Sequence, residues 1–205
     1  MSGGGFAVSG HIGGREDMRI IGGTARGKGL AAPEGMDTRP TSDRTREALF
    51  NILMMRVPGA RVLDLFAGSG ALSAEALSRG AAHAVCVDIS PEACRIIRKN
   101  LDLKGIEGTS EIMQADWQSA LGRLKGEFDI VFLDPPYRMT EVYGQAFSEI
   151  VRRGLLAQDG VAVMEYEQGA SVPLPECAEI YDERKYGKAR VMLVRARRDE
   201  GGAER

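Results

Sequence analysis

The sequence has few of the features that would mark a secreted, membrane-bound or zinc-dependent protein. Its 205 residues include three cysteines, an odd number without metal-site spacing, so we interpret Cys86, Cys94 and Cys177 as reduced packing residues and expect no metal. No apolar run approaches the roughly 18 residues of a membrane-spanning helix. The stretch 1–17 also lacks the apolar segment of a secretory signal. We therefore expect a cytoplasmic protein that contacts no membrane.

The composition is that of an ordinary globular domain. Hydrophobic residues make up 43% and charged residues 27% of the chain. At this length, folding should bury roughly 70% of the surface of the unfolded chain. The formal net charge is −2, yet cations gather in an N-terminal stretch, 15–46, and a C-terminal stretch, 184–198. Two solvated faces and a polyanion-binding surface both explain these stretches, and composition does not decide between them.

The chain divides into four parts. A glycine-rich stretch opens it and a charged stretch closes it, and both are predicted to be disordered. In the extension that follows the leader, a short strand at 18–21 precedes a basic loop, and Thr41 or Ser42 caps a helix that ends before Pro58. The four parts are the leader (1–17), the hairpin and helix extension (18–58), the main domain (59–198) and the tail (199–205).

Short apolar runs alternate with helical stretches after Gly59, which is typical of βαβ units. Near the end, Pro173 and Pro175 disfavour a crossover helix and Gly187 separates two further strands. The sequence therefore predicts an α/β, Rossmann-like fold: a mostly parallel seven-stranded sheet with helices on both faces and an antiparallel C-terminal hairpin. The predicted strands are 61–66, 84–89, 110–114, 128–133, 161–165, 178–182 and 190–194, and the predicted helices are 71–79, 91–103, 117–125 and 141–153.

Glycines directly follow the first strand of the main domain. Gly68 and Gly70 allow the backbone to approach a ligand closely, and the helix N-terminus behind them favours negative charge. NAD is disfavoured, because Ser73 replaces the third glycine of a dinucleotide fingerprint and the Asp64 carboxylate would repel a pyrophosphate. The pattern Asp64-x-Phe66-x-Gly68-x-Gly70 resembles the first motif of class I methyltransferases that use S-adenosyl-L-methionine (AdoMet). A turn required only for packing is the alternative.

Two further acids follow predicted strands. Asp88 ends the second strand and is placed to accept hydrogen bonds from both ribose hydroxyls of a nucleoside, and we include its neighbour Ile89 in the predicted cofactor site. By the same resemblance, Asp116 and the adjacent Trp117 would lie against the adenine. Asp116 is equally suited to cap the helix that begins at Trp117, and both interpretations stay open.

The sequence Asp134-Pro135-Pro136-Tyr137 comes directly after the apolar stretch 128–133. Each proline removes a backbone N–H and keeps its predecessor extended, so the loop offers hydrogen-bond acceptors almost exclusively. The amino group of a nucleobase is a matching donor. Holding its two protons turns the nitrogen lone pair toward an incoming methyl carbon, while Tyr137 offers the flipped base a stacking face. We therefore predict that these four residues are catalytic, with a rigid turn as the alternative.

One motif is a near miss. Residues 22–28 fit the G-x-x-x-x-G-K pattern of a phosphate-binding loop, but Gly29 replaces the Ser or Thr that holds magnesium, so we reject ATP binding. A basic loop that touches nucleic-acid phosphates is the better interpretation. The predicted RNA-binding residues are Arg26, Lys28, Arg39, Arg44, Arg184, Lys185 and Lys188.

Together these motifs resemble the bacterial 16S ribosomal RNA guanine-N2 methyltransferase family called RsmD. The matching segments are Met18 to Gly23, Arg39 to Thr41, Arg46 to Leu53, Asp64 to Gly70 and Asp134 to Tyr137. The resemblance implies a class I methyltransferase fold, AdoMet as cofactor, and methyl transfer to N2 of one guanine in the small ribosomal subunit or its assembly intermediate. It implies a catalytic loop of Asp134, Pro135 and Tyr137, a cofactor site lined by Asp64, Gly68, Gly70, Asp88 and Asp116, and a segment, 39–46, that faces cofactor and RNA.

Three other functions are weighed against this one. An adenine-N6 DNA methyltransferase would use the same acceptor loop, but about 40 ordered N-terminal residues are too few for a domain that reads a DNA sequence. A non-catalytic RNA-binding protein would not need the acceptor loop. An NAD-dependent oxidoreductase would bind nicotinamide. We expect a monomer.

Overall fold

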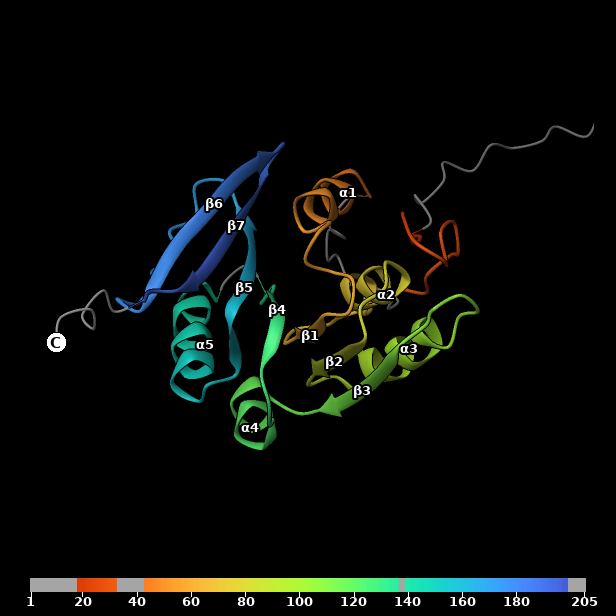
Figure 1. The fold of residues 1–205 in the computed structure, drawn as a ribbon, viewed down its shortest axis with the longest axis horizontal. Coiled ribbons are helices and arrows are strands. Elements are labelled where there is room, and N and C mark those ends of the chain that lie inside the picture. Colours follow the sequence, from red (N-terminus) through yellow and green to blue (C-terminus); the bar gives the residue numbers. More distant parts are fainter. Residues whose placement is uncertain (1–17, 33–42, 137–138, 199–205) are drawn as a thin grey trace, which may run out of the picture.

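The computed structural model describes residues 18–32, 43–136 and 139–198, and helices and strands alternate along most of this chain (Figure 1). The helices are α1 (Asp43–Ile52), α2 (Ala71–Ser78), α3 (Pro91–Leu101), α4 (Trp117–Arg123) and α5 (Thr140–Arg152). The strands are β1 (Arg61–Asp64), β2 (His83–Asp88), β3 (Thr109–Gln114), β4 (Phe128–Leu133), β5 (Leu156–Glu167), β6 (Ala178–Tyr186) and β7 (Ala189–Ala196).

The strands form one seven-stranded sheet in the order β3-β2-β1-β4-β5-β7-β6. Strands β1 to β5 pair in parallel with one another, and β7 runs antiparallel to both β5 and β6. The predicted mostly parallel sheet with an antiparallel C-terminal hairpin is confirmed. The order of the strands reverses between β1 and β4. In α/β proteins, the crevice that binds the ligand forms beyond the carboxyl ends of the strands at such a point.

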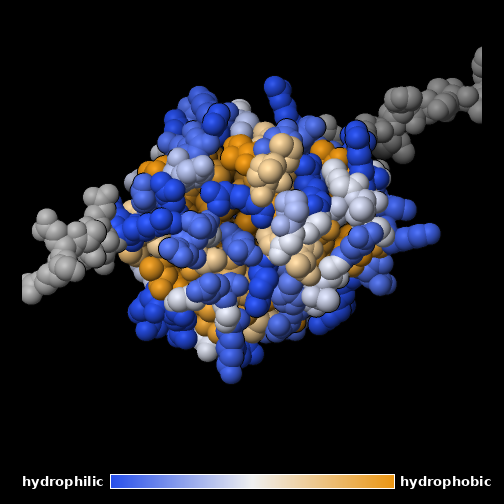
Figure 2. All heavy atoms as spheres, in the orientation of Figure 1, coloured by the Kyte–Doolittle hydropathy of each residue, from blue (hydrophilic) through white to orange (hydrophobic). Residues whose placement is uncertain are grey.

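Helices cover both faces of the sheet (Figure 1). Successive side chains of a strand point to opposite faces, so β1 buries Val62 against Phe50 of α1 and Leu77 of α2. On the other face it buries Leu63 in the core that contains Phe147 of α5. The face of the molecule shown in Figure 2 is mostly hydrophilic, with apolar side chains visible in patches between the polar ones. The sheet therefore lies between two layers of helices, and the carboxyl ends of its parallel strands form one edge of this middle layer.

Two strands are longer than the apolar pattern predicts. β5 begins at Leu156 rather than at 161, and its register with β4 shifts between Phe128 and Ile130, which interrupts the apolar pattern there. β6 continues through charged residues to Tyr186. It is the edge strand, so its side chains meet water on the outer side and carry no continuous apolar signal.

The N-terminal segment 18–32 packs against α2 as a loop. The predicted strand at 18–21 is wrong: a single antiparallel bridge between Arg19 and Gly29 closes the loop instead. The backbone N–H groups in the middle of the segment find their partners on α2, since Thr24 N donates to the carbonyl of Ser78 at 2.8 Å. The N–H groups of Ile20 and Leu30 still donate to the carbonyls of Lys28 and Met18, at 2.9 and 2.7 Å, so the segment is a hairpin with one bridge that is held against the helix.

Several expectations fall on residues outside the described ranges: the disordered leader and tail, and helix capping by Thr41 or Ser42. The three cysteines are free thiols, with Cys86 and Cys94 buried and Cys177 half-buried. In the parts of the chain that are described, no helix is long and apolar enough to span a membrane.

Candidate active site at the carboxyl edge of the sheet

The predicted site residues converge where β1, β2 and β4 end. Asp64 is the last residue of β1, Asp88 is the last residue of β2, and Asp134 follows the last residue of β4. β1 is hydrogen-bonded to both β2 and β4. Because parallel strands end at the same edge of a sheet, all three acids stand at the edge where a ligand crevice forms in α/β proteins.

The glycine loop between β1 and α2 leaves room for a ligand at one position and packs tightly at another. Gly68 has φ 54° and nothing within 4 Å of the place where a Cβ would stand. Gly70 has φ 74°, and a Cβ there would lie 3.2 Å from side-chain carbons of Ile97 on α3. Gly68 is therefore the position open to a ligand, whereas Gly70 lets the loop pack on α3.

Asp64 is buried, with an exposed fraction of 2%. The hydroxyl of Ser73, in α2, donates to its Oδ2 at 2.9 Å. Burial raises the pKa of Asp64 from 3.8 to about 7, with the charge of Asp88 adding to the rise and the Ser73 hydrogen bond opposing it. A bound cation would favour its ionised form. Ser73, which the sequence shows only as a departure from a dinucleotide motif, thus positions a predicted cofactor residue.

Asp88 joins the glycine loop to the end of β2. Its Oδ2 accepts from Gly68 N at 2.9 Å, and its Oδ1 accepts from Ser90 N at 2.8 Å. Each carboxylate oxygen has a second lone pair, so ribose hydroxyls can still donate to it. The neighbouring Ile89 is an apolar side chain with an exposed fraction of 70%. Phe66, at the start of the loop, is half-buried.

Asp116 caps α4. Its carboxylate accepts from the N–H of Ser119 at 2.8 Å and from the Ser119 hydroxyl at 2.6 Å, and these bonds lower its pKa. The capping interpretation is therefore confirmed, and contact with the adenine of a cofactor stays a prediction. The adjacent Trp117 is half-buried at the first position of α4.

The proline loop continues directly from β4. Asp134 is half-buried, Pro135 is buried and Pro136 is exposed, whereas Tyr137 lies outside the described residues. The carbonyl of Pro136 already accepts a hydrogen bond from Met139 N at 2.9 Å, which turns the chain toward α5. Of the loop's acceptors, this one is therefore already engaged.

The pKa of Asp134 is raised well above 3.8 by burial first, then by the charges of Glu165 and Asp64. A carboxyl group in this setting takes up a proton more readily than one in water. Asp134 can therefore both accept a hydrogen bond from an amino group and receive a proton from it.

The predicted RNA-binding residues lie in several places. Arg26, Lys28 and Arg44 are exposed on the N-terminal segment and α1, while Arg39 is outside the described ranges. Lys185 and Lys188 are exposed beside the turn between β6 and β7. In the sheet, Ala189 pairs with Glu167, the last residue of β5, so this turn stands at the same edge as the proline loop.

The cations of the C-terminal stretch, 184–198, are less available to bind RNA than the sequence suggests. Four of its arginines are ion-paired with acids from β6 or β5, so their charge is partly neutralised. The pairs are Arg184–Asp182 at 3.0 Å, Arg190–Glu183 at 3.0 Å, Arg195–Glu179 at 3.2 Å and Arg198–Asp159 at 2.6 Å. Among the predicted residues of this stretch, Lys185 and Lys188 have no ion pair in the described part of the chain.

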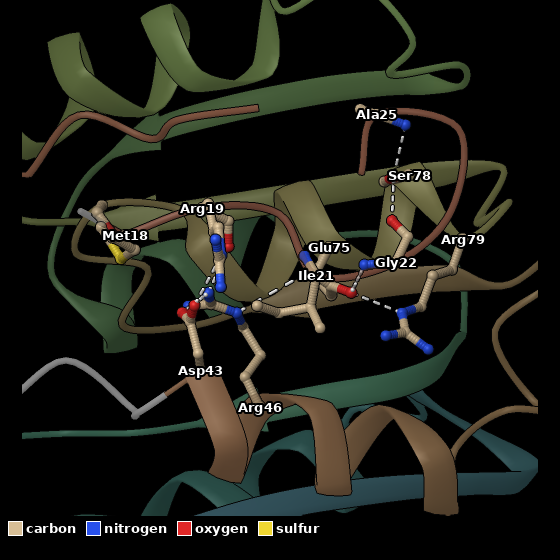
Figure 3. Close-up of polar contacts among 11 residues, drawn as sticks. Met18, Arg19, Ile21, Gly22, Ala25, Asp43, Arg46, Glu75, Ser78 and Arg79 are labelled. Carbon is tan, nitrogen blue, oxygen red and sulfur yellow. Dashed lines mark hydrogen bonds and ion pairs between the residues drawn. The ribbon is translucent and has the colours of Figure 1, made fainter. Parts of the chain in front are cut away.

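A buried ion-pair network holds α1 on α2 (Figure 3). The sequence analysis expected Arg46, as part of the segment 39–46, to face cofactor and RNA, and it gave Glu75 no role. Arg46 of α1 has an exposed side-chain fraction of 1% and donates to Asp43 at 2.8 Å, while its Nε lies 3.9 Å from a carboxylate oxygen of Glu75. Glu75 of α2 accepts from the N–H groups of Ile21 and Gly22 at 2.7 and 2.8 Å. This network fixes α1 and the N-terminal segment on α2.

Glu165, near the end of β5, was also missed, although it is 8% exposed and acts on Asp134. Charged residues on a helix or strand usually indicate a solvated face, and an isolated glutamate in the apolar run 161–166 is the signal that could have drawn attention to it. Among the described residues, no group of three or more His, Cys, Asp or Glu side chains is arranged to hold a metal ion.

Comparisons with known proteins show the family to which the chain is similar. A family model described as "Conserved hypothetical protein 95" matches residues 18–195. The chain is 35% identical over 182 residues to the ribosomal RNA small subunit methyltransferase D of Escherichia coli strain K12, covering 88% of this chain and 90% of the relative. It is 34% identical over 176 residues to the protein of the same name from Haemophilus influenzae, covering 83% and 90%. The solved structure of the Escherichia coli protein yhhF superposes with a TM-score of 0.78 at 31% identity, covering 89% of this chain and 99% of that one.

Proposed function

Because this chain belongs to the RsmD family of AdoMet-dependent methyltransferases, we propose that it methylates the exocyclic N2 of one guanine in 16S ribosomal RNA. The substrate would be the small ribosomal subunit or an intermediate of its assembly. The relatives named for small-subunit methylation are similar to this chain over most of its length, which supports this choice of substrate. The resemblance seen in the motifs thus leads to a specific reaction.

One observation carries the proposal: the proline loop stands beside the glycine loop, at the ends of neighbouring strands. Asp134 and the glycine loop end neighbouring parallel strands, β4 and β1. A nucleobase amino group held at Asp134 would therefore lie close to a cofactor held at the glycine loop. Such proximity is the main requirement when the group to be transferred is already activated.

The residues around the glycine loop fit AdoMet. The second lone pairs of Asp88 suit the ribose hydroxyls, the exposed side chain of Ile89 suits the flat apolar adenine, and the buried carboxyl of Asp64 suits the cationic methionine end. The open space at Gly68 admits the ligand. When bound, AdoMet supplies a methyl group activated on a sulfonium sulfur.

The proline loop positions the amino group of the guanine. The carboxylate of Asp134 and the carbonyl of Pro135 accept hydrogen bonds from the two amine protons, so that the lone pair of N2 points toward the cofactor side of the crevice. Tyr137 is proposed to stack on the flipped guanine, an interaction worth roughly 1 to 3 kcal/mol per base. Lys185 and Lys188 at the same edge would contact phosphates of the surrounding RNA.

Methyl transfer to small subunits tests this function directly. Purified protein is incubated with AdoMet labelled in its methyl group and with small subunits from a strain that lacks this modification, and separately with duplex DNA. We expect label in the RNA of the subunits, recovered as N2-methylguanosine after digestion. Label in DNA adenine, or in neither substrate, would contradict the proposal.

A further inference from the structure

Glu165 and Asp134 are neighbours on adjacent strands. β4 and β5 are parallel, and Leu133 of β4 is in register with Met164 of β5. Asp134 directly follows Leu133, and Glu165 directly follows Met164. The two acids therefore lie side by side, with their side chains on the same face of the sheet. The proposed acceptor of the guanine amine therefore has a second carboxyl group beside it.

Burial and a hydrogen bond from the opposite face hold Glu165 in place. The residue is 8% exposed. Its backbone carbonyl accepts a hydrogen bond from the hydroxyl of Tyr143, which reaches it from α5. The charge of Glu165 acts on Asp134 more strongly than that of Asp64, which is the other acid facing Asp134. Glu165 is thus a fixed source of negative charge beside the proline loop.

Arg46 distinguishes the two carboxyl groups. It approaches from α1 and is coupled by charge to Glu165, as well as to Asp43 and Glu75 behind it. Burial lowers the pKa of Arg46, but a guanidinium keeps its proton in proteins. Arg46 thus lies beside Glu165, whereas the pKa of Asp134 is raised by burial and by the charge of Glu165, so the two carboxyl groups have different surroundings.

We propose that Glu165 is a positioning residue that acts through Asp134: its negative charge makes Asp134 the group that receives the proton leaving the guanine amine. This inference rests on the function proposed above. N2 forms its new bond to the methyl carbon as the carbon–sulfur bond breaks and its electron pair stays on sulfur. An N–H bond then breaks, its electrons return to nitrogen, and the proton moves to a carboxylate oxygen of Asp134. A base whose pKa lies nearer the working pH accepts that proton more readily.

Glu165→Gln tests the inference because it removes the charge while keeping the size of the side chain. Asp134 should then titrate at a lower pH, by roughly one pH unit or more. Two measurements report this shift. The first is the pH titration of the carboxyl carbon resonance of Asp134 in labelled full-length protein without ligand. The second is the pH profile of kcat/KM, whose acidic limb should move to lower pH while its plateau value falls. Glu165→Asp, which keeps the charge, should restore the limb toward its native position.

Glu167→Gln is the matched control, since Glu167 is exposed two residues further along β5 and its removal should leave both readouts unchanged. An unchanged Asp134 titration in Glu165→Gln would overturn the inference. If that variant does not fold, the native protein is titrated instead. Two coupled carboxyl groups give two shared titration steps in the resonances of both Asp134 and Glu165. A single independent step in each resonance would refute the coupling. The resonance measurement needs no RNA, so its outcome is separate from a failure to methylate small subunits.

Discussion

At the scale of single residues, the site is a group of buried carboxyls rather than a set of exposed acids. Asp64 and Glu165 have exposed fractions of 2% and 8%, and Asp134 is half-buried between them. Burial disfavours the charged form of a carboxyl group. Proton binding, folding and ligand binding are therefore linked at this edge of the sheet.

Asp64 provides a measurable case of this linkage. In the folded protein its pKa is raised from 3.8 to about 7. Between these two pH values the folded state keeps a proton that the unfolded state has lost. The group therefore stabilises the fold fully below pH 3.8, and this stability is lost as the pH rises toward 7, by about 1.4 kcal/mol per pH unit.

We expect Asp64→Asn to flatten this part of the pH dependence. The free energy of unfolding is measured with urea for the variant and the native protein at several pH values between about 4.5 and 7.5, which lie mostly between the two pKa values. The exposed Asp159 is the control, and Asp159→Asn should keep the native slope. An identical slope in Asp64→Asn would show that Asp64 is already ionised in the folded state.

Sequence reasoning placed the acids of the site and missed their surroundings. Asp64, Asp88 and Asp134 each follow an apolar run, and parallel strands bring such residues to one edge. Arg46 and Glu75 occupy helix positions whose charge suggests solvent exposure, yet both are buried. Their burial depends on how α1, α2 and the N-terminal segment pack together, which local pattern does not encode.

At the scale of secondary-structure elements, the packing of segment 18–32 on α2 depends on close backbone approach. Gly23 has φ 77°, and a Cβ there would lie 1.8 Å from the carbonyl oxygen of Ser78. Gly27 has φ 81° but nothing within 4 Å of a Cβ position. The two glycines share the same backbone requirement and differ only in what lies next to them.

Gly23→Ala should therefore destabilise the protein much more than Gly27→Ala. A left-handed φ costs roughly 1 to 2 kcal/mol for alanine at either position, whereas only the first variant must also displace the segment from α2. Urea unfolding measures the difference, and hydrogen exchange of the Ile21 and Gly22 amides reports release of the segment from Glu75. Equal losses of stability would mean that the contact with Ser78 is not important.

The elements themselves were largely predictable, and the exceptions have physical reasons. β1 to β4 and the helices after them follow their apolar periodicity closely. The segment 18–21 was predicted as a strand, but it pairs with the facing residues through a single bridge, and the N–H of Ile21 donates to a helix side chain, Glu75. Hydrogen bonds of this kind depend on tertiary contact alone.

At the scale of the whole molecule, the position of charge matters more than its amount. The turn between β6 and β7 carries Lys185 and Lys188 to the edge where the proline loop lies. Arg198 follows β7 at the opposite end of the sheet, and Asp159 pairs with it at 2.6 Å. The net charge of −2 conceals this asymmetry.

Removing both lysines should weaken binding to small subunits and reduce its dependence on salt. Each lysine that contacts a phosphate contributes about 1 to the slope of log affinity against log salt concentration. Lys185→Ala with Lys188→Ala should therefore lower the slope by about 2, and Arg198→Ala should leave it close to native. Filter binding at several salt concentrations provides the slopes, and an unaltered slope in the double variant would place the RNA elsewhere.

The most direct test of the central claim is methyl transfer by Asp134→Ala together with its AdoMet affinity. The account predicts that transfer to undermodified small subunits is abolished while AdoMet binding, measured by calorimetry, stays within a few-fold of native. Asp88→Ala, in contrast, should weaken AdoMet binding itself. If Asp134→Ala methylates small subunits at the native rate, the proline loop does not hold the guanine amine and the account is contradicted.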